Sequence, residues 1–148
     1  MNRWVPLALL LLAGCKPDRY EGHGLSWTPP HGVKLTGDAD TTATFSGGVQ
    51  FEVKPLGTLP PDADEGHLQT VVDTVLPPNV KLFSKRAGTL PAGKVVRVVW
   101  FSPGGNRTLV YYLPVKDRLV LLTLSAPENA FNALESSLDL SLNSLKVQ

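Results

Sequence analysis

The sequence predicts an α+β domain in which helices cover both faces of an antiparallel β-sheet. Three strands follow one another over residues 95–124, and each is nearly continuous in apolar side chains. Strands of that kind are typical of sheets that are buried on both faces. Two segments with helical periodicity, residues 62–76 and 125–145, are available to cover such a sheet.

The first strands are expected near the N-terminal end of the domain. Leu25–Thr28 is a short strand-like run, and the rigid turn Pro29-Pro30-His31-Gly32 would end it. Asp40–Ser46 is rich in β-branched residues and meets Gly47-Gly48, after which Val49–Val53 alternates apolar and polar side chains. Two such segments around a glycine pair predict a β-hairpin.

A capping box predicts the first helix. Asp62 is placed as the N-cap, with Glu65 three residues later, so that the two side chains satisfy free backbone N–H groups of the first turn. An apolar stripe at helical spacing follows, made of Leu68, Val71, Val72, Val75 and Leu76. Pro77-Pro78 would end the helix because proline lacks the backbone donor.

A run of antiparallel strands is expected after this helix. The strands are Val80 to about Ala87, Val95–Phe101, Thr108–Val115 and Arg118–Leu124. The connections are Leu90–Gly93, the turn Ser102–Asn106 and the reversal Lys116-Asp117. A second capping box, Ser125-Ala126-Pro127-Glu128, predicts the last helix. Its apolar face would consist of Phe131, Leu134, Leu138, Leu142 and Leu145.

This order of elements resembles the PsbP-like fold over about residues 25–147. That superfamily includes the extrinsic PsbP proteins of photosystem II, a nuclear Ran-binding factor and small bacterial envelope lipoproteins of the DcrB type. The resemblance implies an antiparallel sheet sandwiched by helices. It also implies a binding or accessory module rather than an enzyme, and it carries over no catalytic residue.

The N-terminal segment resembles a bacterial lipoprotein signal. Arg3 precedes an apolar run from Trp4 to Ala13, and Leu12-Ala13-Gly14-Cys15 then matches a lipobox. The run is about half as long as a membrane-spanning helix needs to be, and it suits an export signal. The resemblance implies cleavage between Gly14 and Cys15 and lipid on Cys15. The alternative is an ordinary secretory signal with an incidental cysteine.

These features divide the chain into a signal peptide (1–14), a lipidated cysteine with a short tether (15–24) and one domain (25–148). Cys15 is the only cysteine, which excludes a disulfide or a cysteine-based metal site within one chain. Lys16 follows it where aspartate would resemble an inner-membrane retention signal. We therefore expect attachment to the bacterial outer membrane, facing the periplasm.

Charge is unevenly distributed along the chain. Residues 16–73 carry four Lys/Arg and nine Asp/Glu, whereas residues 74–116 carry seven basic residues and no acid. Six of the seven form a candidate face for an anionic partner: Lys81, Lys85, Arg86, Lys94, Arg97 and Arg107. Lys81 and Lys85 are expected on one side of their strand, and Arg97 and Arg107 could meet across the hairpin of their two strands. The alternative is that these residues are solvated strand faces that guard an edge.

No catalytic or metal-binding pattern is found. The three histidines, His23, His31 and His67, make no i, i+4 pair, and Gly104-Gly105 lacks the context of a phosphate loop. No Gly-x-Ser-x-Gly is present, and Asp62, Asp64 and Glu65 are interpreted as helix-start residues. The aromatic residues Trp27, Trp100, Tyr111 and Tyr112 are expected in the core, with a pocket lining as the alternative. We expect no cofactor, no metal and no nucleic-acid partner.

Three functions are therefore weighed. The first is a membrane-anchored envelope lipoprotein that binds a protein partner as a non-catalytic accessory module. The second is a carrier or sensor of a small ligand, with a pocket between helix and sheet. The third is a hydrolase that acts on wall or lipid.

Overall fold

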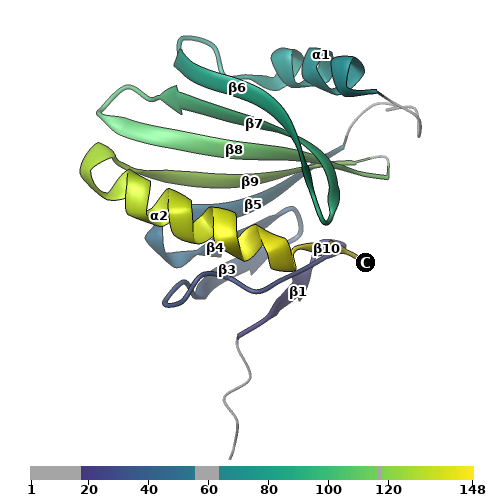
Figure 1. Cartoon of the computed structure of the whole chain (residues 1–148). Helices are drawn as coiled ribbons and strands as arrows, with labels where there is room; N and C mark the ends of the chain where they lie inside the picture. Colours follow the sequence, from purple (N-terminus) through teal and green to yellow (C-terminus); the bar gives the residue numbers. More distant parts are fainter. Residues whose placement is uncertain (1–17, 56–63, 117) are drawn as a thin grey trace, which may run out of the picture.

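The computed structural model describes residues 18–55, 64–116 and 118–148, which form an α+β domain of two antiparallel sheets and two α-helices (Figure 1). The elements are β1 (Tyr20–Gly22), β2 (Leu25–Trp27), β3 (Leu35–Ala39), β4 (Thr42–Phe45), the 3-10 turn η1 (Ser46–Gly48), β5 (Val49–Pro55), α1 (Glu65–Val75), β6 (Lys81–Leu90), β7 (Gly93–Phe101), β8 (Asn106–Val115), β9 (Arg118–Pro127), α2 (Glu128–Ser141), the 3-10 turn η2 (Leu142–Ser144) and β10 (Lys146–Val147).

The larger sheet has the strand order β3-β4-β5-β9-β8-β7-β6, and every neighbouring pair is antiparallel. The predicted hairpin across Gly47-Gly48 and the predicted run of strands from β6 to β9 are confirmed. The prediction missed β3, whose five residues are all exposed and therefore lack a buried apolar face. It also missed the two-residue strand β10.

Both helix starts differ from the predicted capping boxes. The N-cap of α1 is Asp64 rather than Asp62, and its carboxylate accepts a hydrogen bond of 2.8 Å from the backbone N–H of His67. The N-cap of α2 is Pro127, which makes no side-chain cap. Ser125 instead lies in β9 opposite Thr108, because the ladder with β8 continues to the helix. Pairing with β8 therefore extends β9 to Pro127, beyond its predicted end at Leu124.

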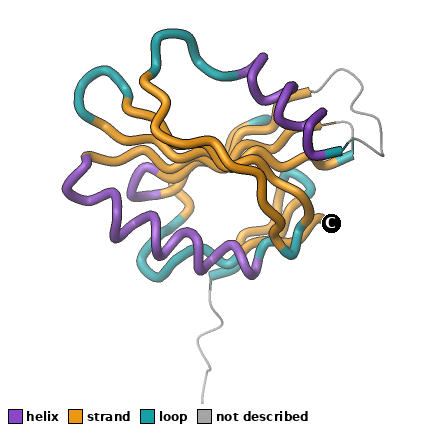
Figure 2. The backbone as a smooth tube through the Cα atoms, turned by 45° about the horizontal axis from the view of Figure 1, so that its top comes forward, coloured by secondary structure: helices purple, strands orange, loops and turns teal. Residues whose placement is uncertain are grey.

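Successive residues of the central strands point to opposite faces of the larger sheet, and both faces are apolar. One face packs Val96, Val98 and Val110 against Leu68 and Val72 of α1. The other face packs against α2 and the smaller sheet, and Figure 2 shows the two helices on opposite sides of the sheet. The prediction that helices cover both faces of the sheet is confirmed only in part. Helix α1 packs on one face, whereas α2 and the smaller sheet share the other.

The smaller sheet has the order β1-β2-β10 and joins the two ends of the described chain. Its first strand lies inside the range 16–24, which was predicted to be a tether. Tyr20 is only 6% exposed, and its ring lies 5.3 Å from that of Phe45 and 5.8 Å from that of Phe51. The prediction of a tether up to residue 24 is therefore wrong for β1, because the hydrophobic contacts of Tyr20 bind this segment into the core.

Neither α1 nor α2 is long and apolar enough to cross a bilayer, and no other helix among the described residues is.

The turn between β4 and β5 provides a matched test of this packing. Gly47 and Gly48 both have positive φ, so alanine at either position is strained by roughly 1 kcal/mol. A Cβ on Gly48 would lie 2.1 Å from the carbonyl oxygen of Ser125, whereas one on Gly47 meets nothing within 4 Å. We expect Gly48→Ala to lower the free energy of unfolding by about 2 kcal/mol more than Gly47→Ala does, measured by urea denaturation. Equal losses would contradict the close approach of η1 to β9.

Candidate functional site

The cations of the candidate anionic-partner face do not gather on one surface. Lys81 lies opposite Phe101 on the α2 side of the sheet, and Lys85 lies opposite Val98 on the α1 side. A β-bulge between Leu82 and Ser84 shifts the register and separates the two lysines. The expectation that they share a side is therefore wrong. Arg86 and Lys94 are exposed and also lie on opposite sides of the sheet, as their partners Arg97 and Thr89 show.

Arg97 belongs to a polar cluster between the sheet and α2. Its Nε donates a hydrogen bond of 3.1 Å to the hydroxyl of Tyr111, and its guanidinium binds the carboxylate of Glu135. The Tyr111 hydroxyl in turn donates a hydrogen bond of 2.6 Å to Asp139. Burial, followed by the hydrogen bond to Asp139, raises the pKa of Tyr111. The four side chains bind one another, so this cluster joins helix to sheet and leaves no positive charge for an anionic partner.

Arg107 occupies a separate cluster at the start of α2. Its guanidinium donates a 2.8 Å hydrogen bond to Glu128 and a 3.4 Å bond to Asn132. Its central carbon lies 5.0–5.2 Å from the ring centroids of three phenylalanines, which is cation–π geometry. The rings are those of Phe83, Phe101 and Phe131. Arg97 and Arg107 thus lie on the same face but bind different residues and do not meet.

The other predictions from the sequence concern the lipid site, the aromatic residues and metal binding. Gly14 and Cys15 lie outside the described residues. Trp27, Trp100 and the adjacent pair Tyr111-Tyr112 are all buried in the core, as expected for aromatic strand residues. Over residues 18–55, 64–116 and 118–148, no group of three or more His, Cys, Asp or Glu side chains gathers in a geometry that could hold a metal ion.

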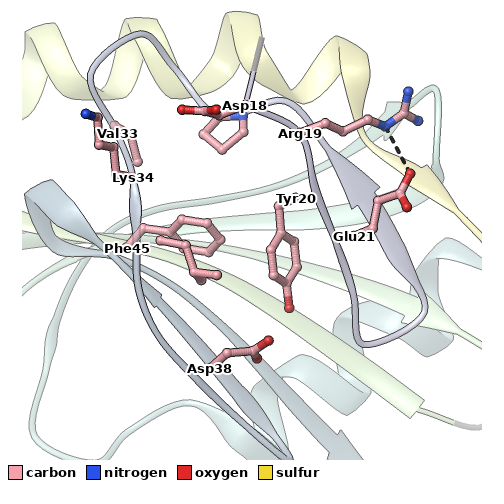
Figure 3. A pocket seen from close by; sticks show the side chains of 10 residues that line it. Asp18, Arg19, Tyr20, Glu21, Val33, Lys34, Asp38 and Phe45 are labelled. Atoms are coloured by element: carbon pink, nitrogen blue, oxygen red, sulfur yellow. Dashed lines mark ion pairs between the residues drawn. The ribbon is translucent and has the colours of Figure 1, made fainter. Parts of the chain in front are cut away.

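A hollow of about 440 Å³ lies between the start of the described chain and the β3–β4 hairpin (Figure 3). Its aromatic lining is Tyr20 and Phe45, with Val33 and Leu35 beside them. Its charged residues are Asp18, Arg19, Glu21, Lys34 and Asp38. Arg19 pairs with Glu21 at 3.7 Å, drawn as a dashed line in Figure 3. The alternative hypothesis placed a pocket between helix and sheet, whereas this hollow lies between β1 and the hairpin.

Tyr20 connects this hollow to the edge of the larger sheet. Its hydroxyl forms a hydrogen bond with Nδ1 of His23, whose Nε2 lies 2.8 Å from the carbonyl oxygen of Ala39 and 3.8 Å from Asp38. Burial and the nearby charge of Asp38 raise the pKa of Tyr20 to about 12. The sequence signal for this site was weak, because a lone tyrosine among polar and glycine residues is also typical of a linker.

The raised pKa values of the three buried tyrosines predict how the stability of the domain depends on alkaline pH. Burial raises the pKa of Tyr20 and of Tyr112 to about 12, and it raises that of Tyr111 as well. The unfolded chain releases these protons near the ordinary value of 10.0, so stability is complete below about pH 10 and is lost as pH rises towards 12. Phenolate absorbance of the folded protein should stay flat up to about pH 10, while the absorbance of the urea-unfolded protein, with its three tyrosines, should rise with a midpoint near pH 10. A tyrosine that titrates near pH 10 in the folded state would contradict the burial.

Comparisons with known proteins show the fold alone. The chain matches no known family model and no curated protein sequence. Among solved structures, it is similar to the solution structure of cyanobacterial PsbP (CyanoP) from Synechocystis sp. PCC 6803, with a TM-score of 0.56 and 15% sequence identity. The match covers 88% of this chain and 92% of the cyanobacterial one. The described domain therefore has a PsbP-like fold, as the order of its elements predicted.

Proposed function

We propose that this chain is a lipid-anchored lipoprotein of the bacterial cell envelope, and that its PsbP-like domain is a non-catalytic binding or accessory module. The lipobox at Leu12–Cys15 supplies the attachment. Each methylene buried in a bilayer contributes about 0.8 kcal/mol, and two or three acyl chains on one cysteine would make release negligible. Lys16 in place of aspartate favours the outer membrane, facing the periplasm.

The observation that carries this proposal is the position of β1. Residues 16–19 are all that separates Cys15 from the buried Tyr20. A chain of this length spans at most about 18 Å between the Cα atoms of residues 15 and 20. Lipid on Cys15 would therefore hold the domain close to the bilayer with its β1 end towards it. Such a short connection suits a module that acts at a membrane-bound complex.

The use of the polar side chains supports a non-catalytic role. Arg97 and Arg107 each bind acidic residues of α2, and Lys85 lies 2.7 Å from Asp73 of α1. Catalytic sites instead combine a nucleophile, a base and an orienting group around an open position. The clusters around Arg97, Arg107 and Lys85 instead join the two helices to the sheet.

The anchor is tested by Cys15→Ser. We expect metabolic palmitate labelling to disappear and the chain to move from the membrane fraction to the soluble fraction. Lys16→Ala is the matched control and should retain both label and attachment. Palmitate that persists in Cys15→Ser would overturn the proposal.

The choice of membrane is tested separately on a density gradient. The native chain should sediment with the outer membrane, and Lys16→Asp should move it to the inner membrane. Native chain in the inner-membrane fraction would contradict the proposed location and leave the anchor intact.

A small-ligand carrier or sensor is the second candidate, and the hollow favours it. Its volume of about 440 Å³ lies within the usual range for small-molecule sites, and its lining combines aromatic and charged side chains. Native mass spectrometry of the chain purified from its own cells should then show a bound small molecule. Leu35→Trp, at a lining position that is already 47% exposed, would fill part of the hollow and should remove that molecule without lowering the unfolding midpoint. A native chain at its lipidated mass alone would contradict this candidate.

A further inference from the structure

The strand β6 forms one free edge of the larger sheet. It runs over ten residues and pairs with β7 on one side, and no strand lies on its other side within the described part of the chain (Figure 1). Backbone N–H and C=O groups of alternate residues therefore face outward, which is the arrangement that an added strand requires. The opposite edge, β3, has only half this length.

Two large apolar side chains are exposed on this edge. Leu82 is 49% exposed and Phe83 is 61% exposed, and the two are adjacent at the β-bulge. The ring of Phe83 packs edge-on against Phe101 at 5.7 Å and lies 5.2 Å from the guanidinium of Arg107. These contacts hold Phe83 in place although most of it faces solvent. A preorganised apolar side chain of this kind loses little conformational freedom when a partner covers it.

The charge of the edge selects the class of partner. Lys81 and Arg86 are exposed, and neither forms an ion pair with any carboxylate of the described residues. Lys85 is different, since Asp73 binds it. Cations along a free edge repel a second copy of the same edge and therefore oppose self-pairing. The same cations would attract an acidic strand, because opposite charges on neighbouring strands are favourable.

We infer that the outer edge of β6 is a docking site for an extended acidic segment of a partner protein, which adds to the sheet as a further strand. The inference deepens the proposed function, on which it rests, by identifying the surface of the accessory module and the chemistry of its partner. Main-chain hydrogen bonds would supply affinity, and the contacts of Phe83, Lys81 and Arg86 would supply specificity.

The position of this edge agrees with an anchored module. The two edge strands of the seven-stranded sheet are six strand spacings apart, which corresponds to roughly 29 Å along the sheet at the usual strand spacing. The smaller sheet, with β1, packs near the β3–β5 end through Tyr20, Phe45 and Phe51. A lipid on Cys15 would thus leave the first half of β6, which begins at Lys81, away from the bilayer and open to a partner in the periplasm, while the β6–β7 turn packs towards the smaller sheet (Figure 1).

Hydrogen–deuterium exchange of the full-length chain in mild detergent tests this inference. The probe is a peptide of alternating glutamate and valine, about as long as β6. We expect it to slow amide exchange in β6 at up to millimolar concentration. A peptide of alternating lysine and valine, and an N-methylated glutamate–valine peptide that cannot donate hydrogen bonds, should have no effect.

Charge reversal at the edge provides the matched variants. Lys81→Glu/Arg86→Glu should weaken binding of the acidic peptide at least about tenfold, whereas Lys34→Glu/Lys146→Glu, which changes two exposed lysines elsewhere, should not. The urea midpoint of each variant verifies folding, and Arg86→Glu alone replaces the double variant if that one unfolds.

Several outcomes would overturn the inference. The peptide could fail to slow amide exchange in β6, or could slow it in β3 instead. The charge reversal could leave binding of the acidic peptide unchanged, or the chain could associate with itself through β6 as its concentration rises. Binding to phosphatidylglycerol vesicles that the charge reversal abolishes, without peptide binding, would assign the cations to a lipid surface instead. The peptide assay does not require Cys15. A soluble chain that still binds the peptide would overturn only the anchor, and an anchored chain that fails to bind would overturn only the docking edge.

Discussion

Two arginines that extend from the central strands hold the C-terminal helix on the sheet, and much of the domain depends on this contact. All three acidic residues of α2, Glu128, Glu135 and Asp139, lie against Arg97 or Arg107. Both arginine side chains are 15% exposed. Forming such a partly buried pair contributes little net free energy, but removing one partner leaves a charge with reduced solvation. The pairs therefore determine where α2 lies, while the apolar face below it supplies most of the stability.

The position of α2 in turn closes the N-terminal part of the domain. Ser141, at the end of the helix, accepts a hydrogen bond of 3.2 Å from the indole of Trp27, and Ser144 accepts one of 2.9 Å from the backbone of Thr28. The chain then pairs β10 with β2, next to β1. Through this sheet the C-terminus secures the segment that follows the expected lipid site. The proposed anchor would thus lie only a few residues before a strand that is packed into the core.

The basic residues of segment 74–116, which contains no acidic residue, have two different roles. Within residues 74–116, Arg97, Arg107 and Lys85 lie next to carboxylates of the flanking helices, so their charge is largely neutralised inside the molecule. Lys81 and Arg86 lie on the free edge strand, and neither forms an ion pair with a carboxylate of α1 or α2 among the described residues. Some of the cations in this acid-free segment therefore hold the helices on the sheet, and others lie on the surface. This division separates a structural role from the proposed recognition role.

Local pattern was enough to predict the α+β class, the run of strands from β6 to β9, the hairpin at Gly47-Gly48 and the apolar stripes of both helices. Each of these depends on neighbours in sequence, through strand alternation, helical periodicity or turn geometry. Tertiary contacts decided the rest. The ladder between β8 and β9 placed Ser125 in a strand instead of a helix cap, and the aromatic contacts of Tyr20 turned an expected tether into β1. One bulge at Phe83 moved Lys81 and Lys85 to opposite faces, because a single extra residue reverses the direction of every side chain that follows.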